Sequence, residues 1–175
     1  MIKAKYPAFV FVAILIFAIA LPIIYYPKLP DQVASHFGVT GKADGWTARN
    51  TFLIIQIATM MLTALVFGIS AFFVTKMPKS LMNFPNKDYW LSEENKEETH
   101  TLIQRFLFWF GSITLGFLTL IFMEAVRANL SGSNSLGERF WIYLGVYLLL
   151  TIYYTVKFSM HFRKKKITQE PGKDS

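Results

Sequence analysis

Four long stretches without a charged residue constrain the fold of this chain more than any other feature. They are the ranges 6–27, 50–75, 106–123 and 140–156. A helix needs about 20 mostly apolar residues to cross the hydrocarbon core of a membrane. The last two stretches are slightly shorter, but charged side chains at their ends can reach interfacial water. With 53% apolar residues overall, the sequence predicts an all-α integral membrane protein with four transmembrane helices.

The distribution of positive charge predicts the orientation. Most of the 18 Lys and Arg residues lie before the first span, between spans two and three, or after the fourth. The other side carries only Lys28, Lys42, Arg49, Arg127 and Arg139. Positive residues concentrate on the cytoplasmic side, so we predict that both termini are cytoplasmic. The net charge of +7 also raises nucleic acid as a partner, but basic residues beside helix ends typically bind anionic lipid. We expect membrane lipid and no nucleic acid.

The spans divide the chain into three parts. Region 1–126 contains two helices, an outer loop at 27–50, a cytoplasmic loop at 75–105 and the third helix. A short outer loop and the fourth helix fill 127–162. The basic tail 163–175 is expected to be disordered.

The N-terminus permits a second interpretation. Lys3 and Lys5 precede an apolar run in which Ala18-Ile19-Ala20 is similar to a signal-peptide cleavage site. The apolar stretch continues to Tyr26, which favours a retained transmembrane helix, and cleavage stays an alternative. The chain contains no cysteine, so disulfides, thiol catalysis and the common zinc sites are excluded.

The outer loop concentrates residues that can carry chemistry. Asp31 is predicted to cap one short helical turn. The glycine-rich segment 38–45 must bend sharply, and Asp44-Gly45 is a turn signal. We therefore expect a compact lid in which His36 lies near Asp31 or Asp44.

Two interpretations of His36 remain open. An imidazole near two carboxylates could bind a divalent metal, act as a general base or sense acidity. Such an enzyme or metal site would use Asp31, His36 and Asp44 and would need all three to converge on a cleft. The simpler interpretation, which we favour, is that His36 and Asp44 hydrogen-bond the turn and hold it closed. No catalytic residue and no cofactor is predicted.

Other polar residues have structural explanations. Ser92 is predicted to cap a helix, with Glu93 and Glu94 in its first turn, that runs directly into span three. Glu124 in that span is expected to pair with Arg127, three residues on.

Gln56 is expected to bond across helices, and Lys157 to extend to the interface. Ala64-x-x-x-Gly68 and Ser112-x-x-x-Gly116 predict close helix packing. A transporter would need several polar groups in series at mid-membrane, which the chain does not offer.

The outer segment "LPDQVASHFGVTGKADGW" resembles the signature of domain of unknown function 1648. The matching positions are Leu29, Pro30, Asp31, His36, Phe37, Gly41, Asp44, Gly45 and Trp46. The cytoplasmic segment "NFPNKDYWL" also resembles one that recurs in these proteins between the second and third helices. Its motif residues are Asn83, Pro85, Asn86, Lys87, Tyr89 and Trp90. The last two suit either an interface anchor or a docking surface for a partner.

The resemblance implies a small multi-pass protein of the bacterial plasma membrane, related to the SdpI-like immunity and signalling proteins. It also implies a peptide toxin or a soluble cytoplasmic regulator as partner. SdpI-like members carry a further multi-helix module that these 175 residues do not contain, so immunity is a loose analogy. We predict a non-enzymatic protein that recognises an envelope component or peptide. The alternatives are the outer-loop enzyme or metal site and a transporter subunit, and the oligomeric state stays open.

Overall fold

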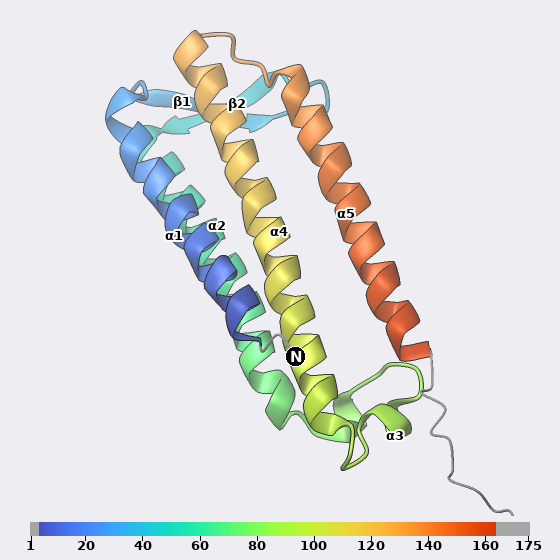
Figure 1. The fold of residues 1–175 in the computed structure, drawn as a ribbon. Coiled ribbons are helices and arrows are strands. Elements are labelled where there is room, and N and C mark those ends of the chain that lie inside the picture. The colour runs from blue at the N-terminus through green and yellow to red at the C-terminus, as the bar shows by residue number, and fades with distance from the viewer. Residues whose placement is uncertain (1–3, 164–175) are drawn as a thin grey trace, which may run out of the picture.

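Four long helices dominate the computed structural model, which describes residues 4–163 (Figure 1). They are α1 (Lys5–Tyr25), α2 (Arg49–Phe73), α4 (Lys96–Ser131) and α5 (Glu138–Arg163). Each is long and apolar enough to cross a membrane. The prediction of a mostly helical fold with four membrane-spanning helices is therefore confirmed.

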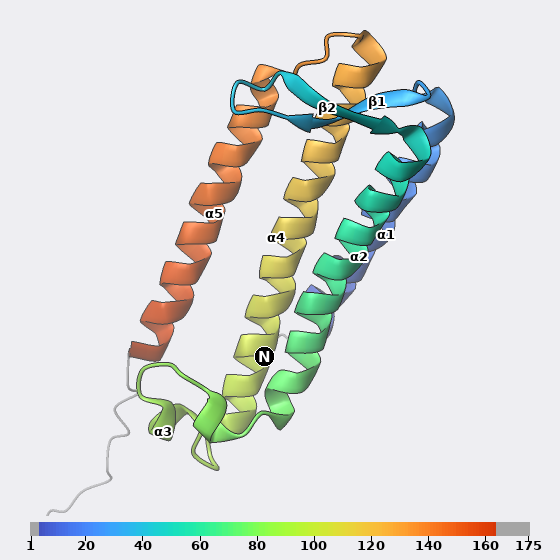
Figure 2. The ribbon, with the colours of Figure 1, turned by 180° about the vertical axis from the view of Figure 1, so that it is seen from behind.

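Helix α4 is the centre of the bundle. It packs against α1, α2 and α5, whereas α5 packs mainly against α4. Figures 1 and 2 show α4 between α5 on one side and the α1–α2 pair on the other. Hydroxyl groups inside α4 bond to carbonyls one turn earlier, as Ser112 does to Phe108 at 2.8 Å and Thr119 to Leu115 at 2.7 Å. These bonds give the hydroxyl groups a partner inside the helix, which is needed because lipid chains cannot form hydrogen bonds.

Side chains of α1 and α2 pack tightly against α4 at Gly111. A Cβ atom there would lie 2.7 Å from Cε2 of Phe11 and 2.9 Å from Cγ of Phe67. In each predicted small-residue pair, only the first residue packs closely. Ala64 and Ser112 are buried, but Gly68 and Gly116 face open space. A buried cluster surrounds this crossing, made of Phe11, Ala18, Met60, Ala64 and Leu115.

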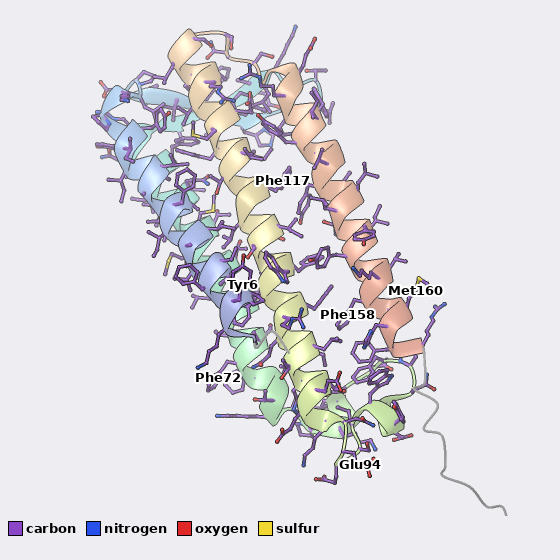
Figure 3. All side chains as sticks on the ribbon, in the orientation of Figure 1. Tyr6, Phe72, Glu94, Phe117, Phe158 and Met160 are labelled. Carbon is purple, nitrogen blue, oxygen red and sulfur yellow. The ribbon has the colours of Figure 1, made fainter. Side chains whose placement is uncertain are left out.

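Most apolar side chains of the bundle point outward. Figure 3 shows Met160 pointing away from the bundle, while Phe158 points from α5 toward α4. None of the 18-residue apolar window of α5 is buried, and only 17% of each window in α1 and α2. Such a surface is the expected lipid-facing exterior of a membrane bundle.

A two-stranded antiparallel sheet lies across one end of the bundle, which we call the outer end (Figure 2). Strand β1 (Gln32–Phe37) follows α1 and the short helix η1 (Tyr26–Lys28), and β2 (Ala43–Ala48) leads into α2. The predicted helical turn after Asp31 is therefore wrong. Val33 and Phe37 suit a strand, and β1 is completed by pairing with β2.

The predicted bend within residues 38–45 is confirmed, but the predicted turn at Asp44-Gly45 is wrong. Asp44-Gly45 lies inside β2, and the chain reverses at residues 38–42, where Gly41 has a φ of 77°. The amide of Gly38 donates to the Lys42 carbonyl at 2.9 Å, and that of Gly41 to the Gly38 carbonyl at 2.8 Å. A backbone conformation with positive φ costs little energy for glycine, because glycine has no Cβ atom. The position of Gly41 therefore determines where the chain turns.

The opposite end, which we call the inner end, carries the start of α1 and the end of α5 (Figures 1 and 2). Its connection contains η2 (Val74–Lys76), η3 (Lys79–Leu81) and the one-turn helix α3 (Lys87–Trp90). Helix α4 begins at Lys96, after Asn95, so the predicted cap at Ser92 is wrong. Ser92 is part of a preceding turn, where its hydroxyl accepts from Asn95 Nδ2 at 3.1 Å.

Once started, α4 does continue without a break into the span, as predicted. Of the predicted disordered tail, all but Arg163 lies outside the described residues.

The crossing at Gly111 generates a matched test. Gly111→Ala and Gly116→Ala gain the same helix propensity, but only the first adds an atom where there is no space. We expect Gly111→Ala to be less stable than Gly116→Ala by about 1–3 kcal/mol, the usual cost of overpacking. Reversible unfolding of both variants in mixed micelles measures the difference. Equal stabilities would contradict the tight crossing.

Candidate functional site

The outer hairpin is attached to the bundle by one side chain of α4. Asn129 Oδ1 accepts from the Ala34 amide at 2.7 Å, and Asn129 Nδ2 donates to the Ala34 carbonyl at 3.0 Å. The same Nδ2 also donates to the Ala125 carbonyl of its own helix at 2.8 Å. The carboxamide therefore takes the place of a neighbouring strand along the edge of β1.

An apolar cluster lies beneath this attachment. Val33 is fully buried. It packs with Leu29, the residue that follows η1, and with residues of α2 and α4. The buried members are Leu29, Val33, Phe52, Phe122, Ala125 and Val126. The exposed polar strand residues thus stand on a packed base, as residues of a recognition surface require.

Arg49 closes the base of the hairpin. Its Nη1 donates to the Leu29 carbonyl at 2.8 Å, and its Nη2 lies 3.1 Å from Oδ1 of Asp31. The guanidinium also lies over the ring of Tyr26, 4.7 Å from its centre. Asp31 therefore has a structural partner that the sequence analysis did not identify.

The hairpin turn is joined to the segment between α4 and α5. Leu136 donates its amide to the Gly41 carbonyl at 2.8 Å, and the Ala43 amide donates to the Asn134 carbonyl at 2.8 Å. The Ser135 hydroxyl adds a bond to the Gly41 carbonyl at 3.3 Å. These bonds fix the start of α5 relative to the hairpin. We call this contact the outer clamp.

His36 and Asp44 pair across the two strands, through Nδ1 and Oδ1. This confirms that His36 lies near Asp44. The pair is accessible: the side chains are 75% and 54% exposed. His36 is the cross-strand partner of Gly45, and a Cβ atom at Gly45 would lie 3.0 Å from the Cβ atom of His36.

The alternative of one metal site formed by Asp31, His36 and Asp44 does not hold. Asp31 belongs to Arg49 at the hairpin base. Within residues 4–163, no group of three or more His, Cys, Asp or Glu side chains could hold a metal ion. Asp31 therefore does not join His36 and Asp44 in one cluster.

A polar cavity lies beside the hairpin, and the sequence analysis missed it. We call it the outer cavity, and it measures about 390 Å³. It lies between the end of α4, the start of α5 and the linker, which is the segment 132–137 that joins these two helices. Its lining residues are Glu124, Arg127, Ala128, Ser131, Ser133, Ser135, Gly137, Glu138 and Arg139. The sequence signal was present: three serines at alternate positions lie between two Glu–Arg pairs.

Glu124 is the buried charge of the outer cavity. Its side chain is only 4% exposed and pairs with Arg127, as predicted, through Oε1 and Nη1. An ionisable residue in a membrane-spanning helix is costly unless it is paired or lines a polar space. Glu124 meets both conditions.

The inner motif holds the other end of α5. Asn86 Nδ2 donates to the carbonyls of Phe162 and Arg163 at 3.1 and 3.2 Å, and Trp90 Nε1 donates to Phe162 at 3.1 Å. The rings of Phe84 and Phe162 lie 4.4 Å apart. These donors satisfy terminal helix carbonyls that have no partner within the helix. We call this contact the inner clamp.

The inner clamp changes the interpretation of the motif. Trp90 is only 5% exposed, so its ring serves packing rather than docking. Asn83 and Pro85 are exposed, and Lys87 and Tyr89 are half-buried. Beside them the Lys79 ammonium, 2.9 Å from Asp88 Oδ1, holds the pKa of that carboxyl below its ordinary value.

These features define a helical multi-pass membrane protein with a hairpin fixed across one end. Residues 13–62 match the family model described as Domain of unknown function (DUF1648). The matched segment covers most of α1, the hairpin with the outer motif and the first part of α2, whereas the predicted cytoplasmic segment 83–91 lies outside it. No curated protein and no solved structure matches the chain. Asn129 and the outer linker lie outside the matched segment.

Replacing Asn129 by leucine tests the hairpin attachment. The variant Asn129→Leu leaves the buried amide and carbonyl of Ala34 without partners, at about 1–3 kcal/mol for each group. Hydrogen exchange at Ala34 should accelerate by roughly 10-fold or more. Asn83→Leu, an exposed position at the inner end, is the control. Unchanged exchange in Asn129→Leu would contradict the attachment.

The inner clamp gives a parallel test on neighbouring aromatic residues. Trp90→Phe keeps a ring but loses the bond to Phe162, whereas Tyr89→Phe loses a hydroxyl that makes no hydrogen bond within residues 4–163. Losing one neutral bond costs about 1 kcal/mol. Exchange in the last turn of α5 should therefore rise about five-fold in Trp90→Phe and stay unchanged in Tyr89→Phe. Equal behaviour of both variants would contradict the clamp.

Proposed function

We propose that this protein recognises a peptide or another envelope component at its outer end and performs no chemistry on it. The observation that carries the proposal is the outer cavity beside a fixed hairpin. The cavity offers charges of both signs and three hydroxyl groups. That combination suits a peptide, which presents backbone donors and acceptors together with charged ends.

The hairpin supplies the second half of the surface. Trp46 is more than half exposed, and Val39 at the turn is almost fully exposed. Exposed aromatic residues on a rigid base are typical anchors of recognition surfaces. The His36–Asp44 pair lies on the same hairpin and adds a polar contact.

The setting that we propose is the bacterial plasma membrane, with both termini in the cytoplasm. The support is the excess of Lys and Arg at the inner end, which is typical of a cytoplasmic face. The outer cavity would then meet peptides that arrive from outside the cell. A role in immunity or signalling, with a soluble regulator at Asn83, Pro85, Lys87 and Tyr89, follows from the SdpI-like resemblance and is part of this proposal.

Filling the outer cavity tests the proposed function. A Cβ at Gly137 would lie 3.6 Å from Oε2 of Glu124, whereas a Cβ at Gly145 meets nothing within 4 Å. Gly137→Phe therefore puts a ring at the cavity just before α5, and Gly145→Phe makes the same change within α5, away from the cavity. Cells that produce each form at equal abundance would be challenged with a panel of secreted antimicrobial peptides.

We expect the wild type and Gly145→Phe to raise survival against at least one peptide and Gly137→Phe to lose that protection. Protection by Gly137→Phe equal to the wild type would remove the outer cavity from the function. Absence of protection by the wild type against the whole panel would contradict peptide immunity.

A further inference from the structure

A second hollow lies at the inner end, between α4 and α5. It measures about 220 Å³ and is open along one side; we call it the inner groove. Its lining residues are Leu102, Arg105, Phe106, Trp109, Tyr154, Lys157, Phe158 and His161. Neither motif of the sequence analysis contributes to it, and the proposed recognition at the outer end does not use it.

The inner groove carries positive charge without a counter-ion in its lining. Arg105 and Lys157 contribute two cations and His161 a titratable imidazole, and none of the lining residues is acidic. Glu98 lines an adjoining recess that shares Leu102 and His161 with the inner groove. An unpaired cation at the edge of the hydrocarbon region is costly and marks a site for an anion.

Arg105 has unused hydrogen-bonding capacity at this place. Its Nε atom is buried and has no hydrogen-bond partner among the described residues. Buried donors are rarely left unpaired, and each one needs an explanation. Lys157 Nζ makes one long bond, 3.4 Å to the hydroxyl of Tyr153. The Nη groups of Arg105 make no hydrogen bond among the described residues, so these groups and Lys157 Nζ, rather than the buried Nε, can donate to a further acceptor.

The other lining residues of the inner groove are Leu102 and four aromatic residues, Phe106, Trp109, Tyr154 and Phe158. Phe106 of α4 and Phe158 of α5 stack with their ring centres 4.0 Å apart, and Figure 3 shows Phe158 directed toward α4. An acyl chain packs well against such rings, and α5 is long and apolar enough to cross a membrane, with none of its apolar window buried. The volume is below the roughly 300–1,000 Å³ of pockets that enclose a whole small molecule, so it suits a headgroup whose chains stay in the bilayer.

We propose that the inner groove binds the phosphate headgroup of an anionic phospholipid, with Arg105 and Lys157 as the phosphate ligands. Basic pockets between helices at the cytoplasmic side suit such headgroups. The lipid would also fill the open side of the α4–α5 contact, where α5 has no other helix as a major neighbour.

Native mass spectrometry of the detergent-solubilised full chain tests this proposal. Phosphatidylglycerol and phosphatidylcholine would be titrated separately, and the bound lipids counted. The variants are Lys157→Gln, the charge-conserving Lys157→Arg, and Arg105→Gln. Lys76→Gln is the control, because Lys76 also lies at the inner end but outside the groove. Circular dichroism verifies that each variant keeps its helices.

We expect the wild type to bind phosphatidylglycerol more tightly than phosphatidylcholine. Each removed charge in the groove should weaken phosphatidylglycerol binding roughly five-fold, at about 1 kcal/mol per basic residue. Lys157→Arg and Lys76→Gln should bind like the wild type, and millimolar inorganic phosphate should not displace the lipid.

Three results would overturn the proposal. The first is equal binding of both lipids by the wild type. The second is unchanged phosphatidylglycerol binding in Lys157→Gln and Arg105→Gln, or an equal loss in Lys76→Gln. The third is displacement by inorganic phosphate, which would identify the occupant as a soluble anion. Peptide protection at the outer end is measured separately, so either proposal can fail alone.

Discussion

The two hydrogen bonds between Asn129 and Ala34 are the interaction on which the outer half of the structure depends. A two-stranded hairpin is marginal by itself in water. Here a carboxamide from α4 satisfies the buried edge of β1, and Val33 is packed into the apolar cluster below. Once β1 is fixed, β2 is positioned by pairing, and the turn at Gly41 meets the linker that leads into α5. The outer cavity is the space that this arrangement leaves open.

Helix α5 shows why both sequence motifs are needed. Along its length it packs mainly against α4, and apolar packing between helices gains little in lipid. Its start is bonded to the hairpin through Leu136 and Asn134, and its end to Asn86 and Trp90. Each motif therefore clamps one end of the same helix. Between the clamps, the open side of the α4–α5 contact is available to lipid.

Features that depend on neighbouring residues in the sequence were predicted correctly. Features that depend on contacts between distant residues were not predicted. Charge-free stretches revealed the four spans, and spacing alone predicted the Glu124–Arg127 pair. The sequence predicts a helical turn after Asp31, whereas the structure has a strand there. Local signals could not reveal this strand, because it is stabilised by Asn129, which lies 95 residues from Ala34. The outer cavity was missed for the same reason, since linker and helix ends form it together. The bond between Asp31 and Arg49 was not predicted, because nothing local in the sequence indicates it.

The most direct test of the clamped arrangement is the distance between α5 and the opposite helix. The chain has no cysteine, so Leu62→Cys in α2 and Leu149→Cys in α5, both exposed positions, give one unique pair of spin labels. Double electron–electron resonance in lipid nanodiscs should give one narrow distance distribution. It should broaden when Gly41→Val breaks the outer clamp, because only glycine suits that backbone, or when Asn86→Ala and Trp90→Phe together break the inner one. A distribution that stays narrow in both backgrounds would contradict the claim that the two motifs hold α5 in place.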